Sequence, residues 1–65
     1  MSRDARINPV AGDVLAIGMK QWEVSTADSG GIITVRNGAK NVMSLATFRS
    51  FFKLASTVRY GDERD

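Results

Sequence analysis

The sequence predicts an all-β fold, a small five-stranded antiparallel barrel with one short helical turn, and three observations indicate it. Asn37-Gly38 stands between two apolar runs and suits a two-residue hairpin turn, because both of its residues adopt positive φ angles. The other apolar or alternating runs are equally short and are bounded by turn-forming residues. A chain of 65 residues holds one domain, in which short antiparallel strands must close on themselves or leave unpaired edges.

The first two strands are predicted in the N-terminal half of the chain. Residues 14–17 form an apolar run suited to a strand, and Gly18-Met19 can then reverse the chain direction. Residues 21–26 alternate, with Trp22 and Val24 on one face and polar side chains on the other. This alternation is typical of a half-buried strand.

The Asn37-Gly38 turn joins predicted strands at 32–36 and 39–43. A two-residue turn fixes their register, so residue 33 pairs with residue 42 and residue 35 with residue 40. The more apolar face of this hairpin is predicted to point inward. The residues on that face are Ile33, Val35 and Val42, with the stem of Lys40 along the sheet. The opposite face leaves Ile32 and Met43 outward, where either the next element or a contact surface covers them.

A helical turn and a last strand complete the predicted domain. Residues 44–52 favour one to two helical turns that begin at Ser44, a favourable N-cap residue. Thr47 stands where a full capping box has Glu, so a 3₁₀ turn fits equally well. Residues 53–59 have the β-branched and apolar character of a fifth strand. This order of elements predicts an SH3-like barrel.

The predicted domain has a small core between two loose ends. We expect a flexible arm over 1–8, the SH3-like barrel over 9–60 and a flexible tail over 61–65, because both ends are polar and without period. A core this small favours self-association as an added source of stability. The residues expected in the core are Val14, Ile17, Trp22, Val24, Ile33, Val35, Val42, Leu45, Phe48, Phe52, Leu54 and Val58.

The composition argues against catalysis and metal binding. The chain has no Cys and no His, so disulfides, the commonest general base near neutral pH and the thiol nucleophile are all absent. The carboxylates of Asp13 and Glu23 are assigned to a turn and to the outer face of a strand. We therefore expect a protein that is not an enzyme, with no catalytic residue, metal site, cofactor or small-molecule substrate.

Two sets of residues are candidates for binding a macromolecule. Phe51 lies about 100° from the buried stripe of the helical turn and is expected to be exposed, with basic residues at its rim. This predicts contact with a protein partner, or with a second copy of the chain, through Ile32, Met43, Arg49 and Phe51. The alternative is single-stranded nucleic acid, held by five basic residues if they converge beside an aromatic side chain. Those residues are Arg36, Lys40, Arg49, Lys53 and Arg59.

Charge and hydropathy bear on the location of the protein. The net charge of +2 permits nucleic-acid binding without requiring it. Charged residues occupy positions 3, 4 and 6, and no stretch is long and apolar enough for a signal peptide or a membrane span. We therefore expect a cytoplasmic protein without a membrane partner.

Several motifs resemble short proteins of tailed phages and prophages, from families without assigned function. These motifs are Pro-Val-Ala-Gly-Asp-Val at 9–14, Trp-Glu-Val at 22–24, Ile-Thr-Val-Arg-Asn-Gly at 33–38, and Met43-Ser44-Leu45 followed by Phe48 and Phe52. The resemblance spans residue 9 to about residue 52 and consists of turn and core residues. It implies an accessory role in a phage or mobile element.

The layout is also similar to that of the plasmid-borne trimethoprim-resistant dihydrofolate reductases, tiny barrels that work as tetramers. That family lines its shared pore with a Val-Gln-Ile-Tyr segment. The comparable segment here is Asn41-Val42-Met43-Ser44, which lacks the Gln and the Tyr. The similarity therefore concerns the layout of the chain, and it implies a tetramer with a central cavity only as a third alternative.

Overall fold

The computed structural model of the chain describes residues 3–62, which form an all-β fold with a single short helix. The elements are β1 (Val14–Ile17), β2 (Lys20–Asp28), β3 (Gly31–Arg36), β4 (Ala39–Met43), α1 (Leu45–Phe51) and β5 (Ser56–Arg59). The predicted fold class is thus confirmed. The first and fourth strands have the predicted bounds, the second is longer than predicted, and the fifth begins three residues later.

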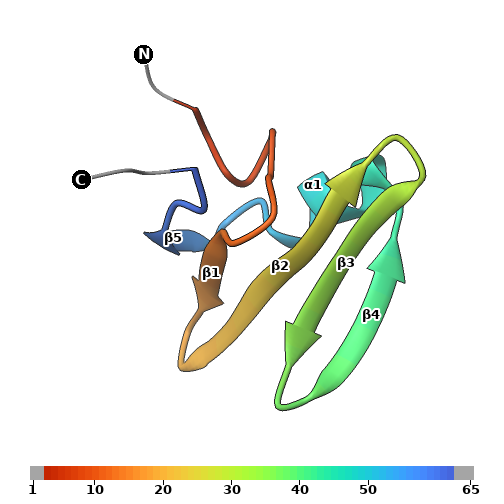
Figure 1. Cartoon of the computed structure of the whole chain (residues 1–65). Coiled ribbons are helices and arrows are strands. Elements are labelled where there is room, and N and C mark those ends of the chain that lie inside the picture. Colours follow the sequence, from red (N-terminus) through yellow and green to blue (C-terminus); the bar gives the residue numbers. More distant parts are fainter. Residues whose placement is uncertain (1–2, 63–65) are drawn as a thin grey trace.

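The strands form one antiparallel sheet in the order β4-β3-β2-β1-β5. Figure 1 shows the long strand β2 between β1 and β3, and α1 at the end of the β3–β4 hairpin opposite its turn. The edges of the sheet are β4 and β5, and no strand pairing joins them within residues 3–62. Closure of the sheet into an SH3-like barrel therefore stays a prediction.

The hairpin turn and its register are as the sequence predicts. Asn37 and Gly38 both have positive φ angles, 53° and 80°, as a type I′ turn requires. Ile33 pairs with Val42, and Val35 pairs with Lys40. The turn chemistry alone therefore fixed which residues of the two strands face each other.

The prediction of which hairpin face is buried was wrong. Ile32 is 3% exposed and Thr34 is fully buried, whereas the side chain of Val42 is 72% exposed. The cause lies in the neighbouring strand: Thr34 pairs with Val24, whose face is already inward, and a bulge follows that pair. Because paired residues share a face, β3 must bury the same side as β2. This places Ile33 and Val35 on the outer face of the sheet.

The core lies between the inner face of the sheet and α1. Its buried apolar residues are Ala5, Leu15, Val24, Ile32, Phe48, Phe52 and Ala55, with partly buried Ile17, Trp22, Ala27, Met43 and Tyr60 packed against them. Of the predicted core, Leu54 is 87% exposed, and Leu45 and Val58 are also exposed. The chain after α1 buries Ala55, so its larger neighbour Leu54 points to solvent.

The helix begins as predicted. The side chain of Ser44 accepts a hydrogen bond from the backbone N–H of Thr47, so Ser44 is the N-cap residue. Phe48 is buried within α1, and Phe52 is the C-cap residue. The rings of Phe48 and Phe52 lie 4.6 Å apart and anchor the helix to the sheet.

Candidate functional site

The residues predicted for a protein interface do not form one exposed surface. Phe51 is 49% exposed and Arg49 is exposed, both on α1. Ile32 is buried, because β3 turns this face inward, and its partner in the ladder, Met43, is only partly exposed. A partner molecule therefore cannot reach Ile32, and this part of the prediction was wrong.

Phe51 packs on neighbouring aromatic rings rather than standing alone. Its ring lies 5.4 Å from the ring of Trp22 and 4.8 Å from that of Phe52, in both cases edge to face. The guanidinium of Arg36 lies 5.6 Å from the centre of the Trp22 ring. These rings pack together where α1 meets the sheet, so about half of the Phe51 surface is buried.

The basic residues predicted for nucleic acid are spread over the molecule. Arg36 and Lys40 lie on opposite faces of the hairpin, and Arg59 lies on β5 at the other edge of the sheet. Arg59 is 3.7 Å from the carboxylate of Glu23. Arg49 donates a 2.9 Å hydrogen bond to the carbonyl of Ile7. Lys53 is exposed beyond the helix. The convergence on which nucleic-acid binding depends is not seen.

The outer face of the hairpin carries the apolar side chains that were expected inside. We call Ile33, Val35, Lys40 and Val42 the outer hairpin surface. Ile33 and Val35 are partly exposed, and Val42 beside Ile33 is mostly exposed. Within residues 3–62 no helix covers this surface, because α1 lies on the side of the sheet that buries Ile32. Two ladder pairs thus present aliphatic carbon to solvent.

The free edge of β4 borders this surface. In a two-residue hairpin the closing pair Arg36–Ala39 is hydrogen-bonded, and the bonding alternates along the ladder. The N–H and C=O groups of Lys40 and Val42 therefore point away from β3. Among the hydrogen bonds of residues 3–62 that lie outside the strand ladders and the helix, none reaches these four groups. The edge can accept another strand.

A second organised feature joins the two ends of the described chain. Arg3 donates to both carboxylate oxygens of Asp13, at 2.7 and 2.9 Å, and to both oxygens of Asp62, at 2.7 and 3.2 Å. Its fifth N–H donates to the carbonyl of Asn8 at 2.7 Å. We call Arg3, Asp13 and Asp62 the terminal cluster. Ala5, two residues after Arg3 in the chain, is fully buried in the core. The division into a flexible arm over 1–8, a barrel over 9–60 and a tail over 61–65 stays a prediction.

Asp13 is fully buried and has four hydrogen-bond donors. Besides Arg3, the backbone N–H groups of Val10 and Gly61 donate to it at 2.8 and 2.6 Å. Burial alone raises the pKa of Asp13, but the hydrogen bonds from Arg3, Gly61 and Val10 outweigh it and hold that pKa below its ordinary value. A side chain at position 61 would overlap the Ala11 carbonyl, so glycine is required there.

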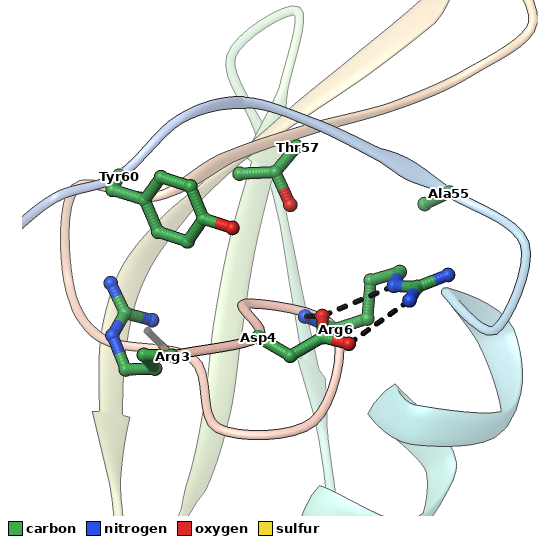
Figure 2. Close-up of a pocket in the computed structure, with 6 residues that line it drawn as sticks. All are labelled: Arg3, Asp4, Arg6, Ala55, Thr57 and Tyr60. Atoms are coloured by element: carbon green, nitrogen blue, oxygen red, sulfur yellow. Dashed lines mark hydrogen bonds and ion pairs between the residues drawn. The ribbon is translucent and has the colours of Figure 1, made fainter. Parts of the chain in front are cut away.

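A shallow pocket of about 520 Å³ opens beside the terminal cluster. It is lined by Arg3, Asp4, Arg6, Ala55, Thr57 and Tyr60. Figure 2 shows the hydroxyl groups of Thr57 and Tyr60 directed into it, and Arg6 bound to Asp4. All five N–H groups of Arg3 are engaged, and Arg6 also donates to the carbonyl of Lys53. The charged groups of this wall are therefore already paired, Arg6 with Asp4, and Arg3 with Asp13 and Asp62 outside the pocket.

These features have little signal in the sequence. Asp13 was expected to bond local backbone, and its bond from Val10 confirms this, but Arg3 and Gly61 lie in segments without any pattern. The outward position of Val42 was missed because the count of apolar residues favoured burial of the face that carries Val42. The buried face is instead decided by the pairing of Thr34 with the inward Val24.

Comparison of the chain with family models, with curated proteins and with solved structures finds no match. The resemblances to phage proteins and to the plasmid reductases therefore stay predictions. Within residues 3–62, no helix is long and apolar enough to cross a membrane. The same residues contain no group of three or more His, Cys, Asp or Glu side chains placed to hold a metal ion.

Proposed function

We propose that this protein is a non-enzymatic binding module that works by protein–protein contact at the outer hairpin surface. The observation that carries the proposal is Val42, a valine in the middle of a strand with 72% of its surface exposed. It stands beside the partly exposed Ile33 and next to a free strand edge. Apolar side chains next to unpaired backbone groups favour contact with another polypeptide.

The charge distribution supports protein over nucleic acid as the partner. A strand of nucleic acid is held by several cations along one groove, with aromatic rings for the bases. Here the five predicted cations lie on β3, β4, α1, the segment after α1 and β5, and Arg59 has an acidic neighbour. The outer hairpin surface carries only Lys40 as a charged group. A contact there should therefore depend weakly on salt.

The biological role and the location of the protein are part of the same proposal. A role as an accessory protein of a phage or mobile element, in the cytoplasm, follows from the resemblance and from the composition of the chain. The terminal cluster serves to hold the fold together, since its charged groups are engaged with one another. The binding role therefore rests on the hairpin.

Site-specific photo-crosslinking tests the contact. A benzophenone amino acid is placed at position 42 of one variant and at position 54 of a matched control, where Leu54 is also exposed but lies far from the hairpin in sequence. Each variant is irradiated as pure protein and in a lysate of the organism that encodes it. The adducts are then treated with nuclease or with protease.

We expect position 42, and not position 54, to give a nuclease-resistant protein adduct in at least one of the two samples. An adduct that nuclease removes would identify nucleic acid as the partner and overturn the proposal. The absence of any protein adduct from position 42 above the control would overturn it as well.

A further inference from the structure

We infer that the partner at the outer hairpin surface is a second copy of this chain, joined through β4 to β4 in antiparallel register centred on Asn41. The inference rests on the proposed function, since it names the partner of that surface. It concerns strand β4, whose residues 39–42 are all exposed.

The free backbone groups of β4 are self-complementary. Lys40 and Val42 point their N–H and C=O groups outward, and Asn41 between them bonds to β3. When a second β4 approaches antiparallel with Asn41 opposite Asn41, each Lys40 faces a Val42 of the other copy. Both of these pairs then exchange two hydrogen bonds. The four backbone groups of Lys40 and Val42 that have no partner among residues 3–62 are thereby all satisfied.

Charge and strand length select this register over its neighbours. A register centred on Lys40 would place two ammonium groups directly opposite, which is destabilising. A register centred on Val42 would pair Lys40 with Ser44, which lies beyond β4 as the N-cap of α1. Only the register centred on Asn41 pairs all five residues of the strand and separates the lysines.

The same register covers the exposed valine. Lys40 and Val42 share the outer face of the sheet, so the aliphatic stem of Lys40 in one copy lies over Val42 of the other. On the outer face, Ile33 and Val42 of one copy then lie in line with Lys40 and Val35 of the other. Apolar carbon is covered, while the ammonium group reaches water.

Pairing of β4 with itself joins two chains and leaves no further β4 edge for a third. The same patch is used by both copies, so the contact closes about a two-fold axis. Pairing of β4 with β5 of another copy would leave a free β4 at one end and a free β5 at the other, and because these are the two edges that pair, the assembly would continue into a fibre. A small domain without disulfides gains stability from such a closed contact.

Cysteine cross-linking tests the register, because the chain has no cysteine of its own. The variants are Asn41→Cys, Lys40→Cys and Val42→Cys, with Ser50→Cys on the exposed side of α1 as the matched control. In the proposed register the two Asn41 α-carbons are about 4.5 Å apart, whereas two Lys40 or two Val42 α-carbons are roughly 8–9 Å apart. A disulfide tolerates the first distance and not the second.

We expect mild oxidation to link Asn41→Cys about 100-fold faster than Ser50→Cys at about 10 μM protein, because pairing raises the effective thiol concentration to about 1 mM. Lys40→Cys and Val42→Cys should each link slowly alone and fast when mixed. Urea at unfolding concentrations should abolish the difference.

Two results would overturn the inference. One is fast linking of Lys40→Cys or Val42→Cys alone with slow linking of Asn41→Cys, which requires another register. The other is no preference among the variants, together with a single-chain mass in light scattering at all concentrations. The second result leaves the proposed function intact if position 42 still cross-links to a different protein in the lysate.

Discussion

At the scale of single residues, the fold depends on a buried charge. Asp13 has no exposed surface, and the bidentate contact from Arg3 compensates the loss of water around its carboxylate. The turn role of Asp13 could be predicted from the sequence, because aspartate commonly bonds backbone N–H groups nearby. Its ion pair could not, because Arg3 stands in a polar segment with no periodicity that would place it.

Replacing Asp13 by Asn should lower the free energy of unfolding by about 3 kcal/mol, because Arg3 then loses its buried partner. Asp62→Asn is the matched control, because Asp62 binds the same guanidinium from an exposed position. Its unfolding midpoint should stay close to that of the unchanged protein. Urea unfolding followed by Trp22 fluorescence measures both. Added trimethylamine N-oxide restores a transition if Asp13→Asn unfolds in buffer. Equal losses in the two variants would contradict the role given to Asp13.

The terminal cluster also predicts a loss of stability in acid. Arg3 lowers the pKa of Asp62, and the hydrogen bonds of Asp13 outweigh its burial and lower its pKa too. Because both folded-state values lie below the unfolded ones, the stabilisation is complete above about pH 5 and is lost as the pH falls below about 4. The urea midpoint should therefore be level from pH 7 to pH 5 and then fall, less steeply in Asp13→Asn. A midpoint that rises on acidification would contradict this.

At the scale of elements, the hairpin shows that the register of two strands can be predicted from the sequence, whereas the face they bury cannot. The turn residues determine the register, and the register was predicted correctly. The buried face depends on the pairing of β3 with β2, which is a contact between segments that the turn does not control. Counting apolar residues favoured Ile33, Val35 and Val42, yet the fold buries Thr34 instead. The turn residues thus determine the register of β3 and β4, and the pairing with β2 determines which face of the hairpin is buried.

This orientation buries an unsatisfied polar group in β3, and its cost in free energy of unfolding can be measured. The hydroxyl of Thr34 is buried and has no hydrogen-bond partner among the described residues. Thr34→Val keeps the shape of the side chain and removes the unsatisfied group, so it should raise the free energy of unfolding by about 1 kcal/mol. Thr26→Val on β2, where the side chain is partly exposed, is the control and should change it little. A loss of stability in Thr34→Val would show that the hydroxyl is satisfied in solution.

At the scale of the whole molecule, the sheet has two free edges and an apolar outer surface that α1 does not cover. The order and type of all six elements could be predicted, because turns, alternation and capping are local signals. The proposed contact surface could not, because exposure is a property of the assembled sheet. Val42 was expected in the core but is exposed, and it forms part of the proposed contact. The small size of the domain is a reason to expect an association, but it does not indicate the surface involved.

Amide hydrogen exchange at two protein concentrations tests the central claim most directly. The N–H groups of Lys40 and Val42 point to solvent in the single chain, whereas that of Asn41 is bonded to β3. As the protein concentration rises from about 10 μM to 1 mM, exchange at Lys40 and Val42 should slow by about tenfold or more, because the second copy covers both groups. Exchange at positions 40 and 42 that stays at the rate of an unprotected amide at every concentration would contradict the account.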